Sequence, residues 1–412
     1  MVAQTFKRLG QTFLKMWESP WWAGGMALLV YALVALRLGS PGWETPYNYF
    51  AYLADAFLHG QLNLRLVPAE TRDLVFYHSH VYLYWPPMPA ILLMPLVAAF
   101  GVHVSDVLVV MLLGAVDVAL VAALLRQVNE KGIAPLDPNR RALLVLFFAL
   151  GSVLLPLAPF GNVWATGQLV AFLFLALAYL AAIALRGGRA FFLTGLALGC
   201  ALLTRNHTVL MGLWPAYFLL NSHWEKGWKK LFQYCLLATL PVLVCGGLYL
   251  AYNYVRFGNP LQVGLDFHNM APSFRQDYQK FGPFNLHYLP INFYYQYIYY
   301  PFPWRLNSLM GGSLFLLSPI LFSIFFGIVK GRPRLSVLFL CLTIFLTSLP
   351  ILLLMGTGWV QFGPRYTLDF TLCLLLLAAM GIKDWPRWLV TALVLLSCLQ
   401  YIIGTWLKIV LS

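Results

Sequence analysis

The chain has 412 residues, of which 61% are hydrophobic and only 10% are charged. Soluble globular domains average roughly 45–50% apolar and about 25% charged residues. This composition excludes a water-soluble domain, a disordered chain and a disulfide-rich secreted module, because so much apolar surface cannot be hidden from water. It predicts an all-α polytopic membrane protein. The formal charge of +13 then reflects Lys and Arg in cytoplasmic loops rather than nucleic-acid binding.

The apolar stretches predict how often the chain crosses the membrane. Crossing ~30 Å of hydrocarbon takes about 20 apolar residues in a helix. Eleven stretches reach or approach this length and are the predicted spans: 22–38, 104–125, 142–157, 164–185, 190–204, 208–220, 231–254, 311–329, 335–355, 366–382 and 388–409. Residues 88–100 are too few and contain Pro89 and Pro95, so this stretch is expected to lie along the membrane surface.

The basic residues predict which loops are cytoplasmic. With eleven spans and the N-terminus inside, 17 of the 27 Lys and Arg lie on the cytoplasmic side, as the positive-inside rule favours. Residues 1–21 are then a retained cytoplasmic N-terminus, because a full-length apolar segment follows them. A transmembrane module at 22–254 contains a first extracytoplasmic segment at 39–103. A second extracytoplasmic segment at 255–310 and C-terminal transmembrane helices at 311–412 follow.

The two extracytoplasmic segments are rich in Tyr, Trp, Phe and Pro, residues that suit the level of the lipid headgroups. Both segments are expected to hold interfacial helices. In the first, apolar residues recur at helical spacing over 49–58, Pro46 and Asn48 favour a turn before this helix, and Gly60 ends it. Glu44 therefore lies in a loop between the first span and this helix, where a carboxylate can meet a substrate.

Acidic residues are scarce, so each of the fourteen is a candidate for function. Four fall in the first extracytoplasmic segment: Glu44, Asp55, Glu70 and Asp73. Asp117 lies within a span, where an ionisable group is costly, and both a functional site and a structural hydrogen bond explain it. His78 and His80 have the spacing of a metal pair, but no third ligand follows at a suitable distance. No metal or other cofactor is predicted, although a divalent ion is left open.

Several short motifs follow one another in an order that resembles a known family. An acid comes soon after the first span, Leu58-His59-Gly60 ends the interfacial helix, and Trp85-Pro86-Pro87 opens the next apolar stretch. Later motifs are Leu203-Thr204-Arg205, Tyr252-Asn253-Tyr254-Val255-Arg256-Phe257-Gly258-Asn259-Pro260 and Phe362-Gly363-Pro364-Arg365-Tyr366. The pattern resembles the GT-C superfamily of polyprenyl-phosphate-dependent membrane glycosyltransferases, nearest to the protein O-mannosyltransferase and aminoarabinose-transferase type (family 39-like). The acidic pair that many relatives carry after the third span is absent here.

The resemblance implies transfer of a sugar, with inversion, from a polyprenyl-phosphate donor to a lipid, glycan or protein acceptor at the outer face of the plasma membrane. A carboxylate would take the acceptor proton, with Glu44 as the first candidate and Asp55 as the second. Arg binds two phosphate oxygens at once. The predicted ligands of the donor phosphate are Arg365, Arg205 and Arg256, which otherwise reach ordinary lipid headgroups. The residues expected to contact substrate are His78, His80, Tyr84 and Tyr366.

Two alternatives to a glycosyltransferase are a membrane transporter or lipid flippase, and a non-catalytic GT-C relative. A transporter is expected to bury charged pairs near the middle of the membrane. Apart from Asp117, the centres of the predicted spans are nearly uncharged, and the polar residues gather at one face. The sequence therefore favours surface chemistry over a path across the membrane.

Overall fold

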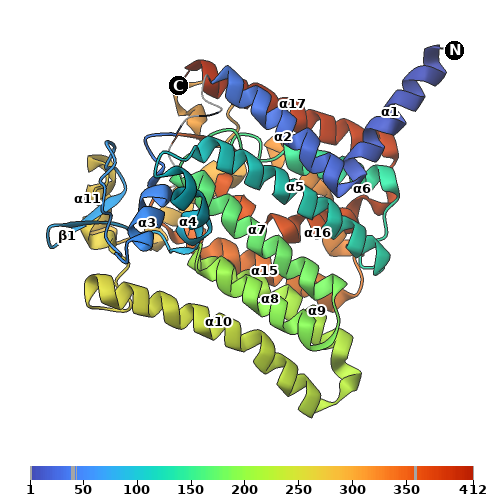
Figure 1. Cartoon of the computed structure of the whole chain (residues 1–412). Coiled ribbons are helices and arrows are strands. Elements are labelled where there is room, and N and C mark those ends of the chain that lie inside the picture. The colour runs from blue at the N-terminus through green and yellow to red at the C-terminus, as the bar shows by residue number, and fades with distance from the viewer. Residues whose placement is uncertain (1, 39–41, 43, 357–359, 412) are drawn as a thin grey trace.

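Long apolar helices that run side by side make up most of the protein (Figure 1). The structure, a computed structural model, describes residues 2–411 except 39–41, 43 and 357–359, so the start of the first predicted extracytoplasmic segment lies outside the described residues. Among the described residues, seven helical stretches are long and apolar enough to cross a membrane: α2 (Pro20–Arg37), α5 (Asp106–Glu130), α7 (Val163–Ala184), α10 (Trp228–Phe257), α15 (Arg334–Leu353), the run Arg365–Asp384 with α16 (Thr371–Gly381), and α17 (Arg387–Leu411). The chain is a multi-pass membrane protein.

The other four predicted spans form shorter or interrupted helices. These are α6 (Pro138–Leu150), α8 (Gly187–Leu202), α9 (Leu213–His223) with a 3₁₀ turn before it (Asn206–Gly212), and the broken run of α13 (Leu314–Leu317), a 3₁₀ turn (Pro319–Phe322) and α14 (Ser323–Lys330). The last run is divided because Ser318, which precedes a proline, leaves the helical conformation. The count of eleven spans stays a prediction. The two termini lie at opposite ends of the bundle, as an odd number of crossings requires (Figure 1).

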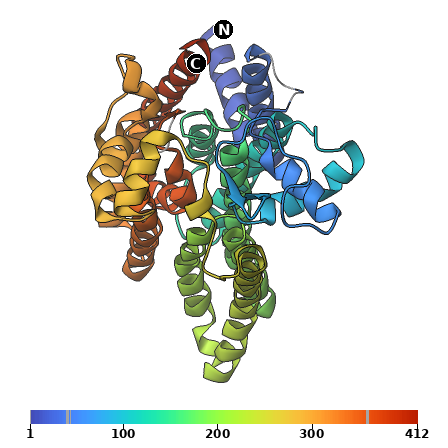
Figure 2. The same ribbon diagram turned by 90° about the vertical axis from the view of Figure 1, so that its left-hand side faces the viewer.

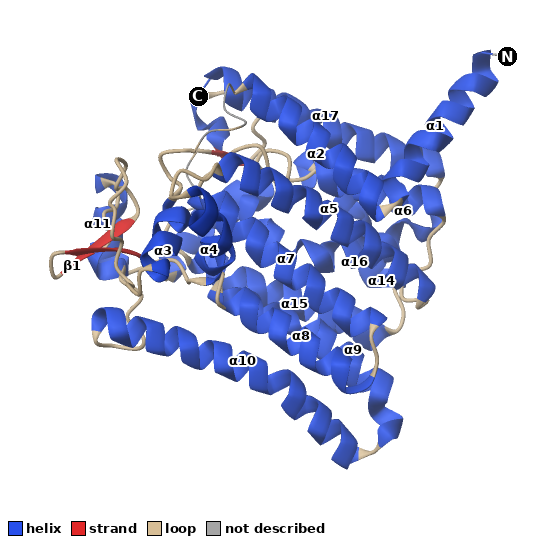
Figure 3. Ribbon diagram, viewed as in Figure 1, coloured by secondary structure: helices blue, strands red, loops and turns tan. Residues whose placement is uncertain are grey.

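One end of the bundle carries the short elements, and we call it the loop end. There lie α3 (Tyr49–Leu58), β1 (Leu74–Tyr77), β2 (His80–Leu83), α4 (Met88–Phe100) and α11 (Pro272–Phe281), whereas α1 (Val2–Glu18) lies at the other end (Figures 1 and 3). The predicted helix at 49–58 is confirmed. Asn48 donates a hydrogen bond from its side chain to the Val104 carbonyl at 2.8 Å, and Gly60 takes a positive φ of 71° just beyond the helix.

A β-hairpin in the first long segment (39–103) was not predicted from the sequence. Strands β1 and β2 pair antiparallel, with Tyr77 opposite His80, and the two residues between them both have positive φ. Such a turn normally favours Asn-Gly, and His78-Ser79 gives no such signal. A second, two-residue pair joins β3 (Met310–Gly311) to β4 (Gln361–Phe362) in parallel.

The two long segments, 39–103 and 255–310, fold against each other. The Asn269 amide donates to the Leu74 carbonyl at 2.8 Å, and the Asp73 amide donates to the Asn269 carbonyl at 3.1 Å. Figure 2 looks onto the loop end and shows the first segment in blue beside the yellow and orange second segment. Parts of the chain that are about 200 residues apart therefore build one surface.

Helix α10 lies along the outside of the bundle and packs against α8 through small residues (Figure 1). At Gly195, a Cβ atom would overlap the Ala238 carbonyl, and at Gly199 it would overlap the Cys245 sulfur. Glycines spaced four apart let two helix backbones approach closely in a membrane, where packing rather than the hydrophobic effect holds helices together.

This packing predicts that Gly195→Leu separates α8 from α10. Overpacking of a close contact costs about 1–3 kcal/mol, so the variant should melt at a clearly lower temperature than the wild type in detergent. The matched control is Gly246→Leu on α10, since a Cβ there meets nothing within 4 Å. Equal melting temperatures for the two variants would show that the Gly195 contact does not hold α10.

The predicted sidedness can be tested by labelling from outside. In a variant without the six native cysteines, Gln61→Cys and Gln279→Cys should react with a membrane-impermeant maleimide on intact cells, because both residues are exposed in the long segments. Asn139→Cys, beside Arg140 and Arg141, should react only after the cells are permeabilised. Labelling of Asn139→Cys on intact cells would refute the assigned orientation.

Candidate active site

Two predicted arginines meet at one tyrosine at the loop end. The guanidinium carbons of Arg365 and Arg205 lie 4.9 Å and 5.6 Å from the centre of the Tyr366 ring. Arg365 follows a turn at Gly363, whose φ is +77°, and begins a 3₁₀ stretch (Arg365–Phe370). Arg205 comes three residues after the end of α8. The structure thus brings together three residues that are far apart in the sequence.

Arg205 is held by a buried carboxylate that the sequence did not indicate as its partner. Asp369 Oδ2 accepts hydrogen bonds from Arg205 Nη2 at 2.7 Å and Nε at 3.2 Å, and His207 Nε2 lies 2.9 Å from the same oxygen. The Asp369 side chain is fully buried. Asp369 therefore fixes the direction of Arg205 and neutralises it.

Arg365 has no such counter-ion. Its Nη2 donates to the Tyr366 hydroxyl at 3.2 Å, and its carbonyl accepts from Gln168 Nε2 at 3.0 Å. Its Nε is buried without a hydrogen-bond partner. Among the described residues, no carboxylate forms an ion pair with Arg365. Part of this guanidinium is therefore free to bind an anion.

Glu44 lies in a loop that is fastened to the start of α5. Asp106 accepts hydrogen bonds from the Thr45 amide at 2.8 Å and from the Thr45 hydroxyl at 2.6 Å. Glu44 as a whole is partly exposed, with Oε1 2.7 Å from His103 Nδ1, while its Oε2 is buried and has no hydrogen-bond partner. A carboxylate in a fixed loop with one unused oxygen is suited to accept a proton.

Aromatic rings connect the loop of Glu44 with Arg365. The rings of Tyr47 and Trp164 lie 5.0 Å apart, and the Arg365 guanidinium carbon lies 6.0 Å from the Trp164 ring. The turn just before Trp164 packs against Asp106, because a Cβ at Gly161 would overlap its carboxyl group. Asp106, the first residue of α5, thus lies beside the turn that precedes α7. The sequence did not indicate this contact, since Asp106 and Gly161 belong to different elements.

Asp55, the second predicted base, is paired within its own segment. Arg65 donates from Nε and Nη2 to the two carboxylate oxygens of Asp55 at 2.9 and 3.0 Å. Only 6% of Asp55 is exposed. Arg65 thus occupies both carboxylate oxygens of Asp55, and this pair holds α3 against the following loop.

Arg256 is buried and holds the hairpin to α10. Its Nη1 donates to the Leu83 carbonyl and its Nη2 to the Asn253 side chain, both at 2.7 Å. Its guanidinium carbon lies 3.7 Å from the centre of the Tyr252 ring. None of the described contacts of Arg256 reaches Arg205 or Arg365, so the structure does not place the three arginines in one cluster.

The two histidines predicted to contact substrate lie at the exposed turn of the hairpin. His78 stacks on Tyr77 with the rings 4.1 Å apart, and His80 Nδ1 lies 2.9 Å from the His78 carbonyl. Within the described part of the chain, no group of three His, Cys, Asp or Glu side chains is arranged to hold a metal ion. The histidines do not share a described contact with Arg205 or Arg365.

Tyr84 lies between the two long segments and close to both site arginines. Its ring stacks on Trp85 at 3.9 Å and meets the His268 ring edge-on at 4.9 Å. His268 is oriented by Asp73, with 3.0 Å between Nε2 and Oδ1. Burial, together with the negative charge of Asp73, raises the pKa of Tyr84 well above its usual value, although Arg365 and Arg205 oppose this. The hydroxyl therefore stays protonated and can donate a hydrogen bond.

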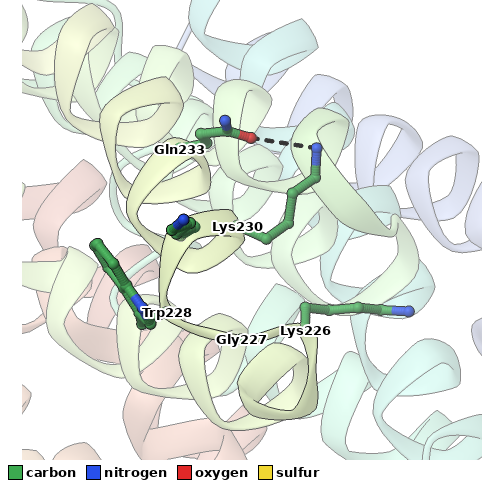
Figure 4. Close-up of a pocket in the computed structure, with 6 residues that line it drawn as sticks. Lys226, Gly227, Trp228, Lys230 and Gln233 are labelled. Carbon is green, nitrogen blue, oxygen red and sulfur yellow. Dashed lines mark hydrogen bonds between the residues drawn. The ribbon is translucent and has the colours of Figure 1, made fainter.

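A hollow elsewhere on the surface does not belong to this site. It has a volume of about 410 Å³ and is lined by Lys226, Gly227, Trp228, Lys229, Lys230 and Gln233 at the start of α10 (Figure 4). Arg256, near the other end of that helix, lies at the loop end. Thirty helical residues span about 45 Å, so the hollow is remote from Arg365.

Comparison with solved structures identifies the fold. The chain is similar to the aminoarabinose transferase ArnT from Cupriavidus metallidurans bound to undecaprenyl phosphate, with 16% identity, a TM-score of 0.50, and coverage of 88% of this chain and 59% of ArnT. The chain has a GT-C fold. It spans less than two thirds of the length of ArnT.

Other comparisons add no further likeness. An oligosaccharyltransferase from Archaeoglobus fulgidus matches with 13% identity and a TM-score of 0.45 over 94% of this chain and 55% of its own, which is too weak to indicate a shared fold. No protein-family model matches the chain, and neither does any curated protein sequence. The resemblance inferred from the motifs is therefore confirmed at the level of the fold.

Because Asp369 is buried, we expect its removal to destabilise the protein more than removal of an exposed acid. Removing one partner from a buried ion pair costs about 3–5 kcal/mol, so Asp369→Ala should lower the melting temperature in detergent strongly. The matched control is Asp384→Asn, whose exposed partner Lys330 is 3.6 Å away, because exposed pairs contribute little. A melting temperature for Asp369→Ala equal to that of the control would contradict the role given to this carboxylate.

Proposed function

We propose that this protein is a glycosyltransferase that moves a sugar from a polyprenyl-phosphate donor to an acceptor hydroxyl at the loop end. The observation that carries the proposal is the partly buried Arg365 guanidinium, which has no carboxylate partner among the described residues and lies beside Arg205 and Tyr366. The fold supports it, since ArnT shares this fold and its structure contains undecaprenyl phosphate. We place the loop end on the outer face of the plasma membrane, following the positive-inside rule.

The proposed chemistry uses one carboxylate and two arginines. The acceptor oxygen attacks the anomeric carbon of the sugar, the bond from that carbon to the phosphate breaks, and the acceptor proton passes to Glu44. Attack from the face opposite the phosphate inverts the anomeric carbon. Arg365 binds the phosphate, and Arg205, fixed by Asp369, supports the same side. No cofactor is required by this scheme.

Glu44 is preferred to Asp55 as the base because of their surroundings. Asp55 is neutralised by Arg65, whereas Glu44 has one carboxylate oxygen without a partner. The Glu44 loop also leads through Tyr47 and Trp164 toward Arg365. Of the two predicted acids, only Glu44 is therefore both unneutralised by an arginine and connected to the cation.

The described spans of this protein lack the paired charges that a transporter would need. Asp117 is fully buried in α5, and both of its carboxylate oxygens are without a hydrogen-bond partner. Within the described residues no basic side chain forms an ion pair with it. A transporter is expected to pair its buried charges, and Asp117 has no such partner, so we favour catalysis at the loop end.

The proposal predicts that Glu44→Gln abolishes transfer without loss of donor binding. A general base contributes typically 10²–10⁴-fold to the rate, and glutamine keeps the size and hydrogen bonding of the side chain. Membranes that contain the protein are supplied with polyprenyl-phosphate-linked radiolabelled sugar, and labelled product is counted. Asp55→Asn should keep most of its activity per folded molecule.

The matched control is Glu70→Gln in the same segment, where the carboxylate accepts from the amides of Thr71 and Arg72 and forms an ion pair with the largely exposed Arg72 side chain. Near-normal turnover by Glu44→Gln together with a dead Asp55→Asn would reverse the two roles. If the wild-type protein neither binds the lipid phosphate nor transfers sugar from it, the proposed function is wrong.

A further inference from the structure

The last helix brings a second cation toward Arg365. Helix α17 packs against the segment before Arg365 so closely that a Cβ at Gly404 would overlap the Phe362 ring, and one at Gly363 would overlap the Tyr401 ring. Lys408 lies one helical turn beyond Gly404, toward the C-terminal end of α17. Since Gly404 packs on Phe362, three residues before Arg365, the position of Lys408 brings its positive charge toward Arg365.

Lys408 is partly buried against an aromatic ring and is not neutralised. Its ammonium nitrogen lies 3.8 Å from the centre of the Phe160 ring, in the turn that precedes Trp164. Among the residues that the structure describes, no carboxylate pairs with Lys408, and none pairs with Arg365. Phe160 in this turn and Trp164 at the start of α7 thus each contact one of the two cations.

Two like charges that are partly withdrawn from water raise the free energy of an empty site. Burial weakens the screening by solvent, so the repulsion grows and each ion loses hydration. An anion placed between them reverses both effects, because it gives each cation a charged partner. The chemistry of the pair therefore calls for a ligand with more than one negative charge.

We propose that Lys408 is a catalytic residue that, together with Arg365, binds the phosphate as it leaves the sugar. This inference rests on the proposed function. In the donor the phosphate is a diester with one negative charge. When the acceptor oxygen bonds to the anomeric carbon, the electron pair of the breaking carbon–oxygen bond passes to the phosphate oxygen and the acceptor proton passes to Glu44. The released lipid phosphate carries up to two negative charges.

A second cation interacts most favourably with the phosphate when the second negative charge of the phosphate develops. Lys408 therefore interacts more strongly with the transition state and with the released lipid phosphate than with the intact donor. Only such differential binding accelerates the chemical step. The site is then selective for the free lipid phosphate over a singly charged diester of the same lipid.

The ordinary explanation for a lysine near the end of a span is that it reaches the headgroups of bulk lipids. The two explanations predict different effects when the positive charge of Lys408 is removed. A lysine that serves bulk lipid affects neither binding of the carrier nor transfer. A lysine that holds the leaving phosphate affects the doubly charged ligand and the rate.

The experiment measures binding to the full-length protein in nanodiscs made of a neutral lipid. The probes are undecaprenyl phosphate and its methyl diester, which has one charge. Wild-type protein should bind the free phosphate at least tenfold more tightly than the diester. In Lys408→Met, which keeps the length of the side chain, affinity for the free phosphate should fall about ten- to a hundredfold, while affinity for the diester stays within about threefold. Transfer should fall in parallel with phosphate affinity.

Two further variants serve as controls. Lys383→Met removes an exposed lysine from the turn before α17 and should change neither affinity, whereas Lys408→Arg keeps the charge and should retain most of the selectivity. If Lys408→Met does not fold, the binding of the two probes to the wild type still tests the inference. Equal affinities of the wild type for the free phosphate and for the diester overturn it.

Equal affinity of Lys408→Met and wild type for the free phosphate also overturns it. Failure of the wild type to bind either probe would instead contradict the proposed function itself.

Discussion

The proposed site depends on an excess of positive charge at the loop end. Asp369 is buried there, and the same carboxylate oxygen is occupied by Arg205 and His207. Arg365 and Lys408 are left without a carboxylate partner among the described residues. In a setting that is only partly hydrated, such cations need an anion. In the function we propose, a lipid-linked phosphate that reaches the site from the membrane supplies this anion.

The scaffold keeps this imbalance in place through contacts between distant parts of the chain. Thr45 and Asp106 fix the loop of Glu44 to α5, and Gly161 lets the turn before α7 approach the same carboxyl group. That turn supplies Phe160 and the start of α7 supplies Trp164, and these are the aromatic neighbours of the two unpaired cations. The ends of apolar helices thus position the proposed base and the two cations, and the packing of these helices is set by the membrane rather than by the site.

Local signals in the sequence predicted part of this architecture. The helix at 49–58 and the helix at 88–100 were found at their observed bounds, because proline precedes each of them and a glycine with positive φ follows. The interruption at Ser318 was missed, since hydropathy averages over a break that one proline causes. The hairpin was missed because its turn, His78-Ser79, lacks the residues that normally mark such a turn.

The sequence could predict only those residues of the candidate site that lie within a single short motif. Arg365, Arg205 and Arg256 were predicted as site residues because a basic residue at the outward end of a span is unusual. The ion pair of Arg205 with Asp369 was not predicted, because 164 residues separate the two in the sequence. Lys408 was overlooked, since a single lysine near the end of the last span has the sequence pattern of an ordinary membrane anchor. Only the packing of α17 against Phe362 reveals what it faces.

The most direct test of the central claim is a structure of the protein in nanodiscs with undecaprenyl phosphate. The account predicts density for the phosphate between Arg365 and Lys408, with the Glu44 carboxylate facing the open side of the phosphate. Density for the phosphate at another place, for example at the lysines around the start of α10, with none at Arg365, would contradict it.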